Sequence, residues 1–80
     1  MSIEVDCGKI TNFEGKHFRV FAHVCEEFQH QLDFVTLKFG NLTTFQGKPS
    51  EATSPLQQQA VAHAQLQVSE LIWDDEVIED

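Results

Sequence analysis

Residues 17–46 read HFRVFAHVCEEFQHQLDFVTLKFGNLTTFQ, and this stretch decides the fold. Apolar residues occupy every second position in its first third, and both sides of the chain are apolar in its middle third. Alternation with a period of two is typical of β-strands, and the pair Gly40-Asn41 between two such segments is typical of a hairpin turn. The expected strands cover residues 17–26, 31–39 and 42–46, with the last one at an edge of the sheet.

The segment before this stretch predicts one more strand, and that strand carries an irregularity. Apolar residues alternate with acidic ones through residues 3–7, and Gly8 then interrupts the pattern. A glycine inside a strand often marks a bulge or bend, so we expect one at this position. Glu14-Gly15 provides the turn into the next strand, because glycine tolerates the positive φ that tight turns require.

The last part of the chain predicts a helix that begins at Ser54-Pro55. Serine is a favoured N-cap residue, and proline is favoured at the first helical position. The acidic cluster at residues 74–76 would face the negative end of the helix dipole, so we expect the helix to end near Trp73. One apolar stripe at helical spacing should pack on the sheet. Its members are Leu56, Ala60, Val61, Ala64, Val68, Leu71 and Ile72.

These elements predict an α+β fold with the order ββββα. The fold is a four-stranded antiparallel meander followed by one C-terminal helix packed on one face, in two layers. We expect residues 1–73 to form a single domain and residues 74–80 to form an acidic C-terminal tail.

Charge is distributed unevenly along the 80 residues. All five Lys and Arg residues lie at or before Lys48, whereas seven of the 13 acidic residues follow it, and the net charge is −8. Binding of nucleic acid is disfavoured because phosphate contacts require clustered lysine or arginine side chains. A small basic group on the expected sheet is the only candidate for such contacts: Lys9, Lys16, Arg19 and Lys38.

The chain shows neither a secretory signal nor an apolar run long enough to cross a membrane. These features predict a cytosolic protein. In that compartment we expect Cys7 and Cys25 to remain reduced thiols.

Two groups of apolar residues have no expected cover in a two-layer fold. Patches of this kind usually mark protein contacts. The first group, on the odd-numbered face of the second and third strands, predicts self-association as a homodimer through Phe21, Val35, Leu37 and Phe39. The second group, on the far side of the helix, predicts a protein-binding site for a basic partner through Leu66, Trp73, Asp74, Asp75 and Glu76. The alternative for the first group is a bulge in the third strand that returns its apolar residues to the core.

No motif for catalysis, cofactor binding or metal binding accompanies these surfaces, and the four glycines are spaced as turn markers. His23 is expected opposite Asp33, as a hydrogen-bonded pair rather than part of a zinc site. The competing hypothesis is a small-molecule or metal binder, or a minor enzyme, with a pocket between sheet and helix. Its expected lining is His17, His23, Cys25 and Asp33.

Three interpretations of the acidic end remain open: a solubilising terminus, an adhesive segment anchored by Trp73, and imitation of a nucleic-acid backbone. In its small size, high acidity and lack of catalytic motifs, the chain resembles accessory proteins of phages and other mobile elements, including inhibitors of host defence. The resemblance is one of general character and rests on no residue motif. It implies a protein that acts by binding another protein.

Overall fold

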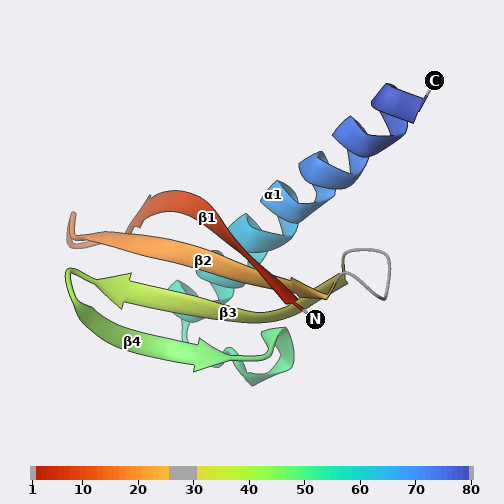
Figure 1. Ribbon diagram of the computed structural model, residues 1–80. Helices are drawn as coiled ribbons and strands as arrows, with labels where there is room; N and C mark the ends of the chain where they lie inside the picture. Colours follow the sequence, from red (N-terminus) through yellow and green to blue (C-terminus); the bar gives the residue numbers. More distant parts are fainter. Residues whose placement is uncertain (1, 26–30, 80) are drawn as a thin grey trace.

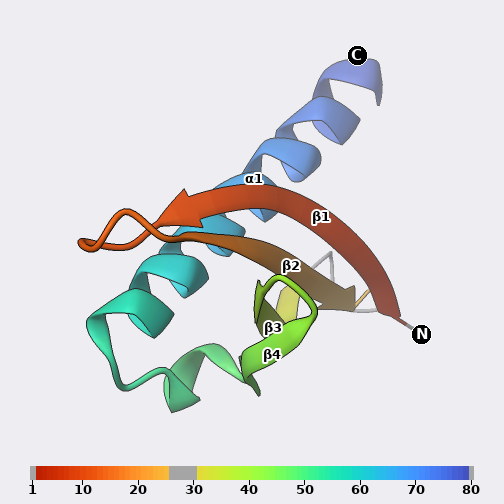
Figure 2. The same cartoon turned by 90° about the vertical axis from the view of Figure 1, so that its left-hand side faces the viewer.

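The computed structural model describes residues 2–25 and 31–79, and within that part the side chains of residues 3–25 and 31–70. Four strands form one antiparallel sheet in the order β1-β2-β3-β4, and a long helix packs across one face of it (Figures 1 and 2). The elements are β1 Ser2–Thr11, β2 His17–Cys25, β3 Gln31–Phe39, β4 Leu42–Gly47, the short 3-10 helix η2 Pro49–Glu51 and α1 Pro55–Glu79. The expected ββββα architecture is confirmed.

Both hairpin turns predicted from glycine are present. Gly15 and Gly40 have φ angles of 83° and 61°, which few residues other than glycine adopt without strain. The β1–β2 turn is also held by the side chain of Asn12, whose Oδ1 accepts hydrogen bonds from the backbone N–H groups of Glu14 and Lys16 at 3.0 and 2.9 Å. The turn therefore depends on an asparagine as well as on the glycine.

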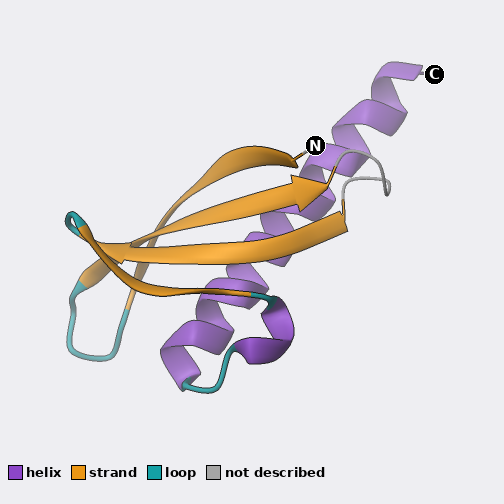
Figure 3. Cartoon of the chain, turned by 60° about the horizontal axis from the view of Figure 1, so that its bottom comes forward, coloured by secondary structure: helices purple, strands orange, loops and turns teal. Residues whose placement is uncertain are grey.

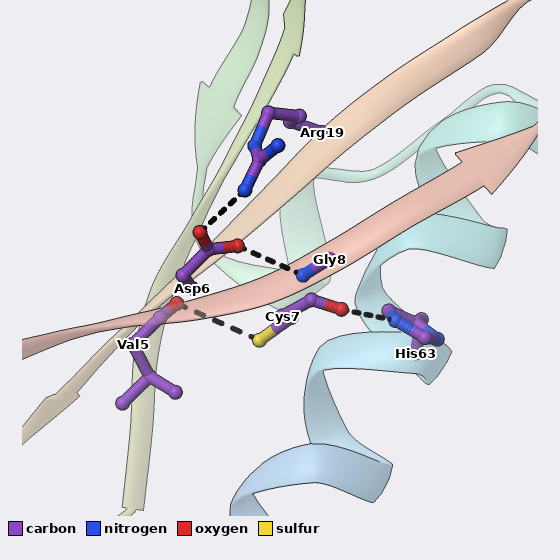
Figure 4. A network of polar contacts seen from close by, with 6 residues as sticks. All are labelled: Val5, Asp6, Cys7, Gly8, Arg19 and His63. Atoms are coloured by element: carbon purple, nitrogen blue, oxygen red, sulfur yellow. Dashed lines mark hydrogen bonds and ion pairs between the residues drawn. The ribbon is translucent and has the colours of Figure 1, made fainter.

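The bulge expected at Gly8 is present and also fastens α1 to the sheet. The β1–β2 register shifts between Asp6 and Lys9, and Gly8 has a φ of 82°. The carbonyl oxygen of Cys7 accepts a hydrogen bond of 2.6 Å from Nε2 of His63 on α1 (Figure 4). Because a carbonyl can only accept, Nε2 of His63 carries the proton. Cys7 and Cys25 are free thiols, as expected, and burial raises the pKa of the Cys7 thiol.

A second bulge, in β3, overturns the predicted face of that strand. Val24 pairs with Leu32, but His23 pairs with Phe34, so the register skips Asp33. A shift of one residue moves every later side chain to the opposite face. The odd-numbered residues Val35 and Leu37 therefore face α1, 0% and 1% exposed.

This bulge corrects two predictions. Val35 and Leu37 do not lie on an uncovered face, because the core encloses them, which is the alternative that the sequence left open. His23 does not lie opposite Asp33, because Phe34 takes that place.

The core lies between the sheet and α1. Three helix residues at successive turns, Ala60, Ala64 and Val68, are buried in it. Of the other residues of the predicted stripe, Leu56 and Val61 pack against this core, and the side chains of Leu71 and Ile72 lie outside the described residues. The two alanines allow the helix backbone to approach the sheet closely, since they add little side-chain volume. The sheet contributes the remaining buried apolar residues: Cys7, Ile10, Phe18, Val20, Ala22, Val24, Val35 and Leu37.

The predicted N-cap of α1 is confirmed and forms a reciprocal capping box. Oγ of Ser54 accepts a hydrogen bond of 3.1 Å from the backbone N–H of Gln57, and Oε1 of Gln57 accepts bonds from the N–H groups of Thr53 and Ser54 at 3.0 and 3.4 Å. These contacts satisfy donors that have no partner within the helix.

Removal of this cap should weaken the fold measurably. We expect Ser54→Ala to lower the free energy of unfolding by about 1 kcal/mol, because the N–H of Gln57 loses its acceptor. Urea unfolding followed by circular dichroism measures the change. Ser50→Ala, at an exposed position in η2, is the matched control and should leave the midpoint unchanged. Equal effects of the two substitutions would contradict the role of the cap.

The predicted end of the helix is wrong. We expected the helix to stop near Trp73, whereas α1 continues to Glu79. The repulsion between an acidic side chain and the helix dipole amounts to about 0.3–1 kcal/mol, and salt screens it. The backbone hydrogen bonds and the good helix propensity of glutamate oppose that cost. Residues 74–79 therefore continue the helix.

The C-terminal end of α1 projects beyond the sheet, which gives the molecule an elongated shape with principal extents of 44 × 21 × 21 Å (Figures 1 and 3). Within the described part of the chain, no helix is both long and apolar enough to cross a membrane.

Candidate functional site

The first candidate surface is the outer face of α1. Leu66 lies there and is 57% exposed, while Ala64 and Val68 on either side of it in sequence are buried against the sheet. The other predicted partner-binding residues belong to the backbone of α1, but their side chains lie outside the described residues: Trp73, Asp74, Asp75 and Glu76. Leu66 thus lies on the face of the helix that the sequence predicted. Partner binding through Leu66 and these four residues stays a prediction.

The second candidate surface is the face of the sheet turned away from α1, here called the open sheet face. Among residues 2–25 and 31–79 no element covers it (Figures 1 and 2). Its members alternate along each strand with residues of the core. They include Glu4, Asp6, Lys9, Thr11, His17, Arg19, Phe21, His23, Cys25, Phe34, Thr36, Lys38, Thr43 and Gln46.

Three cations form one row across the open sheet face. Lys9 of β1 pairs with Arg19 of β2, and Arg19 pairs with Lys38 of β3. Neighbouring strands lie about 4.8 Å apart, so the row spans about 10 Å. Like charges directly opposite each other destabilise a sheet. Repulsion between these cations therefore lowers the stability of the folded sheet at this row. Lys16 of the basic group predicted from sequence lies apart from it, in the β1–β2 turn.

An aromatic ring lies beside the cationic row. The guanidinium of Arg19 and the ammonium of Lys38 lie 6.0 and 5.9 Å from the centroid of the Phe21 ring. These distances allow cation–π attraction between the Phe21 ring and both cations. Phe21 thus differs from the other predicted self-association residues, because it is half-buried on the open sheet face. Phe39 lies at the rim of the core instead, 42% exposed and 5.1 Å from the ring of Phe18.

One carboxylate on the open sheet face, that of Asp6, binds both the bulge and Arg19, the middle cation of the row. Asp6 accepts a hydrogen bond of 2.9 Å from the N–H of Gly8 and an ion-paired one of 2.6 Å from Arg19 (Figure 4). The Gly8 amide and the Arg19 guanidinium hold the pKa of Asp6 below its ordinary value of 3.8. Within the described side chains, no carboxylate forms an ion pair with Lys9 or Lys38.

The lowered pKa of Asp6 predicts a pH-dependent contribution to stability. The folded protein binds this proton less readily than the unfolded chain, so the stabilisation is present above the unfolded pKa and is lost as the pH falls through the folded one. We expect Asp6→Asn to lower the urea midpoint at neutral pH, with the difference shrinking below pH 3.8. Glu14→Gln removes a charge from the adjacent turn and serves as control. A midpoint difference that persists unchanged into acid would contradict the prediction.

A polar network fills the part of the open sheet face next to Phe21. Oγ1 of the buried Thr36 lies 3.2 Å from Nε2 of His23 and accepts a hydrogen bond of 3.1 Å from the side-chain amide of Gln46. The imidazole of His23 also stacks on the Phe34 ring, with centroids 4.0 Å apart, and lies 3.6 Å from a carboxylate oxygen of Glu4. The His23 ring is therefore held by neighbours on the two adjacent strands, β1 and β3.

The competing pocket hypothesis is wrong in its location. His17, His23 and Cys25 alternate along β2 with residues of the core, so they point away from α1 and cannot line a pocket between sheet and helix. Asp33 lies at the β3 bulge and is exposed. In the described part of the chain, no group of three or more His, Cys, Asp or Glu residues could hold a metal ion.

Sequence reasoning missed an apolar hollow at the end of the sheet where the β1–β2 turn meets the start of α1. The cavity has a volume of about 380 Å3, and Phe13, one of its lining residues, is 97% exposed. An aromatic residue inside an otherwise polar turn, residues 12–15, was the available signal. The lining residues are Asn12, Phe13, Ser54, Pro55, Leu56 and Gln59.

No protein-family model, curated protein or solved structure matches the chain. The candidate surfaces are therefore assigned from the geometry and the charge of the chain itself.

Proposed function

We propose that the protein is a small binding module that acts on another protein by surface complementarity, without a catalytic step of its own. The observation that carries this proposal is the continuation of α1 past the sheet. Among the described side chains of α1, the buried ones are Ala60, Ala64 and Val68, which lie within three turns, and the helix backbone continues to Glu79. A helical segment without tertiary packing is marginally stable in water, so a projecting segment is suited to packing on a partner.

The composition of the projecting segment indicates the kind of partner. Residues 71–79 read LIWDDEVIE, five apolar residues interspersed with four acids. Tryptophan is the residue type most enriched at interface hot spots, and acidic residues around an apolar anchor complement a basic rim. We infer a partner protein that offers an apolar groove bordered by lysine and arginine. Leu66, exposed on the outer face of α1, would extend the contact toward the sheet.

A module of this kind is compatible with an accessory or inhibitor protein of a phage or other mobile element. Size and acidity support that role, and the projecting acidic helix provides a contact element for it. The binding of a basic partner can be measured directly on the isolated protein.

An array of synthetic peptides provides the test. Peptides that combine basic and apolar residues are compared with acidic peptides of the same length and hydropathy. We expect the wild-type protein to bind a subset of the basic peptides, and Trp73→Ala to weaken that binding by about 2 kcal/mol or more, which is roughly 30-fold. Equal binding to both classes, or binding that neither Trp73→Ala nor Leu66→Ala weakens, would overturn the proposal. Gln65→Ala, at an exposed position of the same helix outside the stripe of Leu66 and Trp73, is the matched control.

A further inference from the structure

The open sheet face has the chemistry that the projecting end of α1 requires of its partner. It presents the cations Lys9, Arg19 and Lys38 in one row beside the ring of Phe21. The projecting segment has the opposite composition, with four acids and five apolar residues between Leu71 and Glu79. The two surfaces are thus complementary in charge, and each contains an apolar component.

One molecule cannot bring these two surfaces together. α1 packs on the opposite face of the sheet, and its C-terminal end leads away from the sheet (Figures 1 and 2). The cationic row is therefore accessible to the α1 of another copy but not to its own.

The repulsion between the cations of the row favours the binding of an anionic group there. Two like-charged cross-strand pairs, Lys9–Arg19 and Arg19–Lys38, oppose folding. Of the three cations of the row, only Arg19 has a carboxylate partner among the described side chains, Asp6. The four acids of the projecting segment lie within residues 74–79, which extend over about 7.5 Å of helix rise, a length comparable with the roughly 10 Å span of the row. An acidic helix laid across the strands would neutralise both lysines.

We propose that the acidic end of α1 of one copy binds the open sheet face of a second copy, head to tail. This inference rests on the proposed function, because it names the partner of the projecting helix. Each copy offers one helix end and one sheet face, so the contact is heterologous and the assembly can grow beyond a dimer.

Two full-length variants separate the two halves of the contact. The sheet variant, Lys9→Gln with Lys38→Gln, removes the outer cations of the row. The helix variant, Asp74→Asn with Asp75→Asn and Glu76→Gln, removes charge from the projecting segment. Lys16→Gln with Lys48→Gln changes the net charge as much as the sheet variant does but leaves the row intact. The sheet variant should melt no lower than the wild type, since it relieves repulsion between neighbouring cations.

Sedimentation velocity over a concentration series provides the measurement, at about 0.1 M and about 1 M salt. We expect the wild type and the Lys16/Lys48 control to self-associate at the lower salt concentration, and each surface variant to do so at least about tenfold more weakly. An equimolar mixture of the two surface variants should form a dimer that does not grow, because only one helix end and one sheet face remain competent. The mixture should also change the fluorescence of Trp73, the one tryptophan of the chain.

A wild type that stays monomeric, self-association that both surface variants retain, or a mixture that stays monomeric would each overturn the head-to-tail contact. A labelled oligothymidylate tests the competing occupant. Its binding to the monomeric wild type, but not to the sheet variant, would assign the row to nucleic acid instead. If the basic peptides still bind through Trp73 while the wild type remains monomeric, only this inference fails and the proposed function stands.

Discussion

Leu37→Ala is expected to lower the free energy of unfolding by about 3 kcal/mol. Leu37 is among the largest fully buried side chains of the sheet, at 1% exposure, and it packs in the core between the sheet and α1. Truncation to alanine removes buried methyl groups and leaves a cavity that the surrounding side chains fill only in part. A domain of this size has a total stability of roughly 4–12 kcal/mol, so the loss is a large fraction of it.

The same substitution tests the corrected face of β3. Urea unfolding gives the change in stability, and sedimentation gives the mass of the native protein. Leu42→Ala, at a 65% exposed position on the neighbouring strand, is the matched control and should change stability by less than about 0.5 kcal/mol. If Leu37 belonged to a contact between copies, the substitution would reduce association and leave the stability of the monomer unchanged. That result would restore the face predicted from the sequence alone.

Ala64→Asp is expected to destabilise the protein by about 3–5 kcal/mol more than Ala62→Asp does. Ala64 is 0% exposed at the contact between α1 and the sheet, whereas Ala62 is exposed on the same helix. Both substitutions carry the same cost in helix propensity and the same change in net charge, so their difference isolates the burial of an unpaired carboxylate. Aspartate is chosen because its short side chain cannot reach solvent as a lysine does.

Thermal unfolding and circular dichroism at neutral pH measure both variants. Ala64→Asp should lose its cooperative transition or melt far below Ala62→Asp, and recovery is expected when acid neutralises the new carboxylate. Similar melting temperatures for the two variants would mean that α1 does not pack on the sheet through Ala64. The assignment of Leu66 to the outer face of α1 would then be wrong as well.

The elements of this fold follow from local signals. Alternation along residues 17–25 identified β2 and its buried side correctly, because Phe18, Val20, Ala22 and Val24 all lie in the core. Glycine marked both turns and the β1 bulge, since a positive φ leaves few other choices. Ser54-Pro55 marked the start of α1 for an equally local reason, the unpaired N–H groups of the first turn.

The candidate surfaces were predictable only in part. Leu66 was placed correctly on the outer face of α1, because helical periodicity fixes the angular position of a residue. The basic group was visible as residue types, but the alignment of Lys9, Arg19 and Lys38 in one row required the register of three strands. The bond from His63 to the carbonyl of Cys7 joins residues 56 positions apart, and no local pattern indicates it.

The sequence by itself determined the order of the elements, the positions of the turns and most of the apolar residues available for the core, because these features depend on residues that are neighbours in the chain. The tertiary structure alone decided which side of β3 faces the helix and how far α1 extends. In a strand that is apolar on both sides, local alternation does not select a face. The bulge at Asp33 selects it, because the shifted register places Val35 and Leu37 opposite Ala22 and Val20, where packing against α1 buries all four.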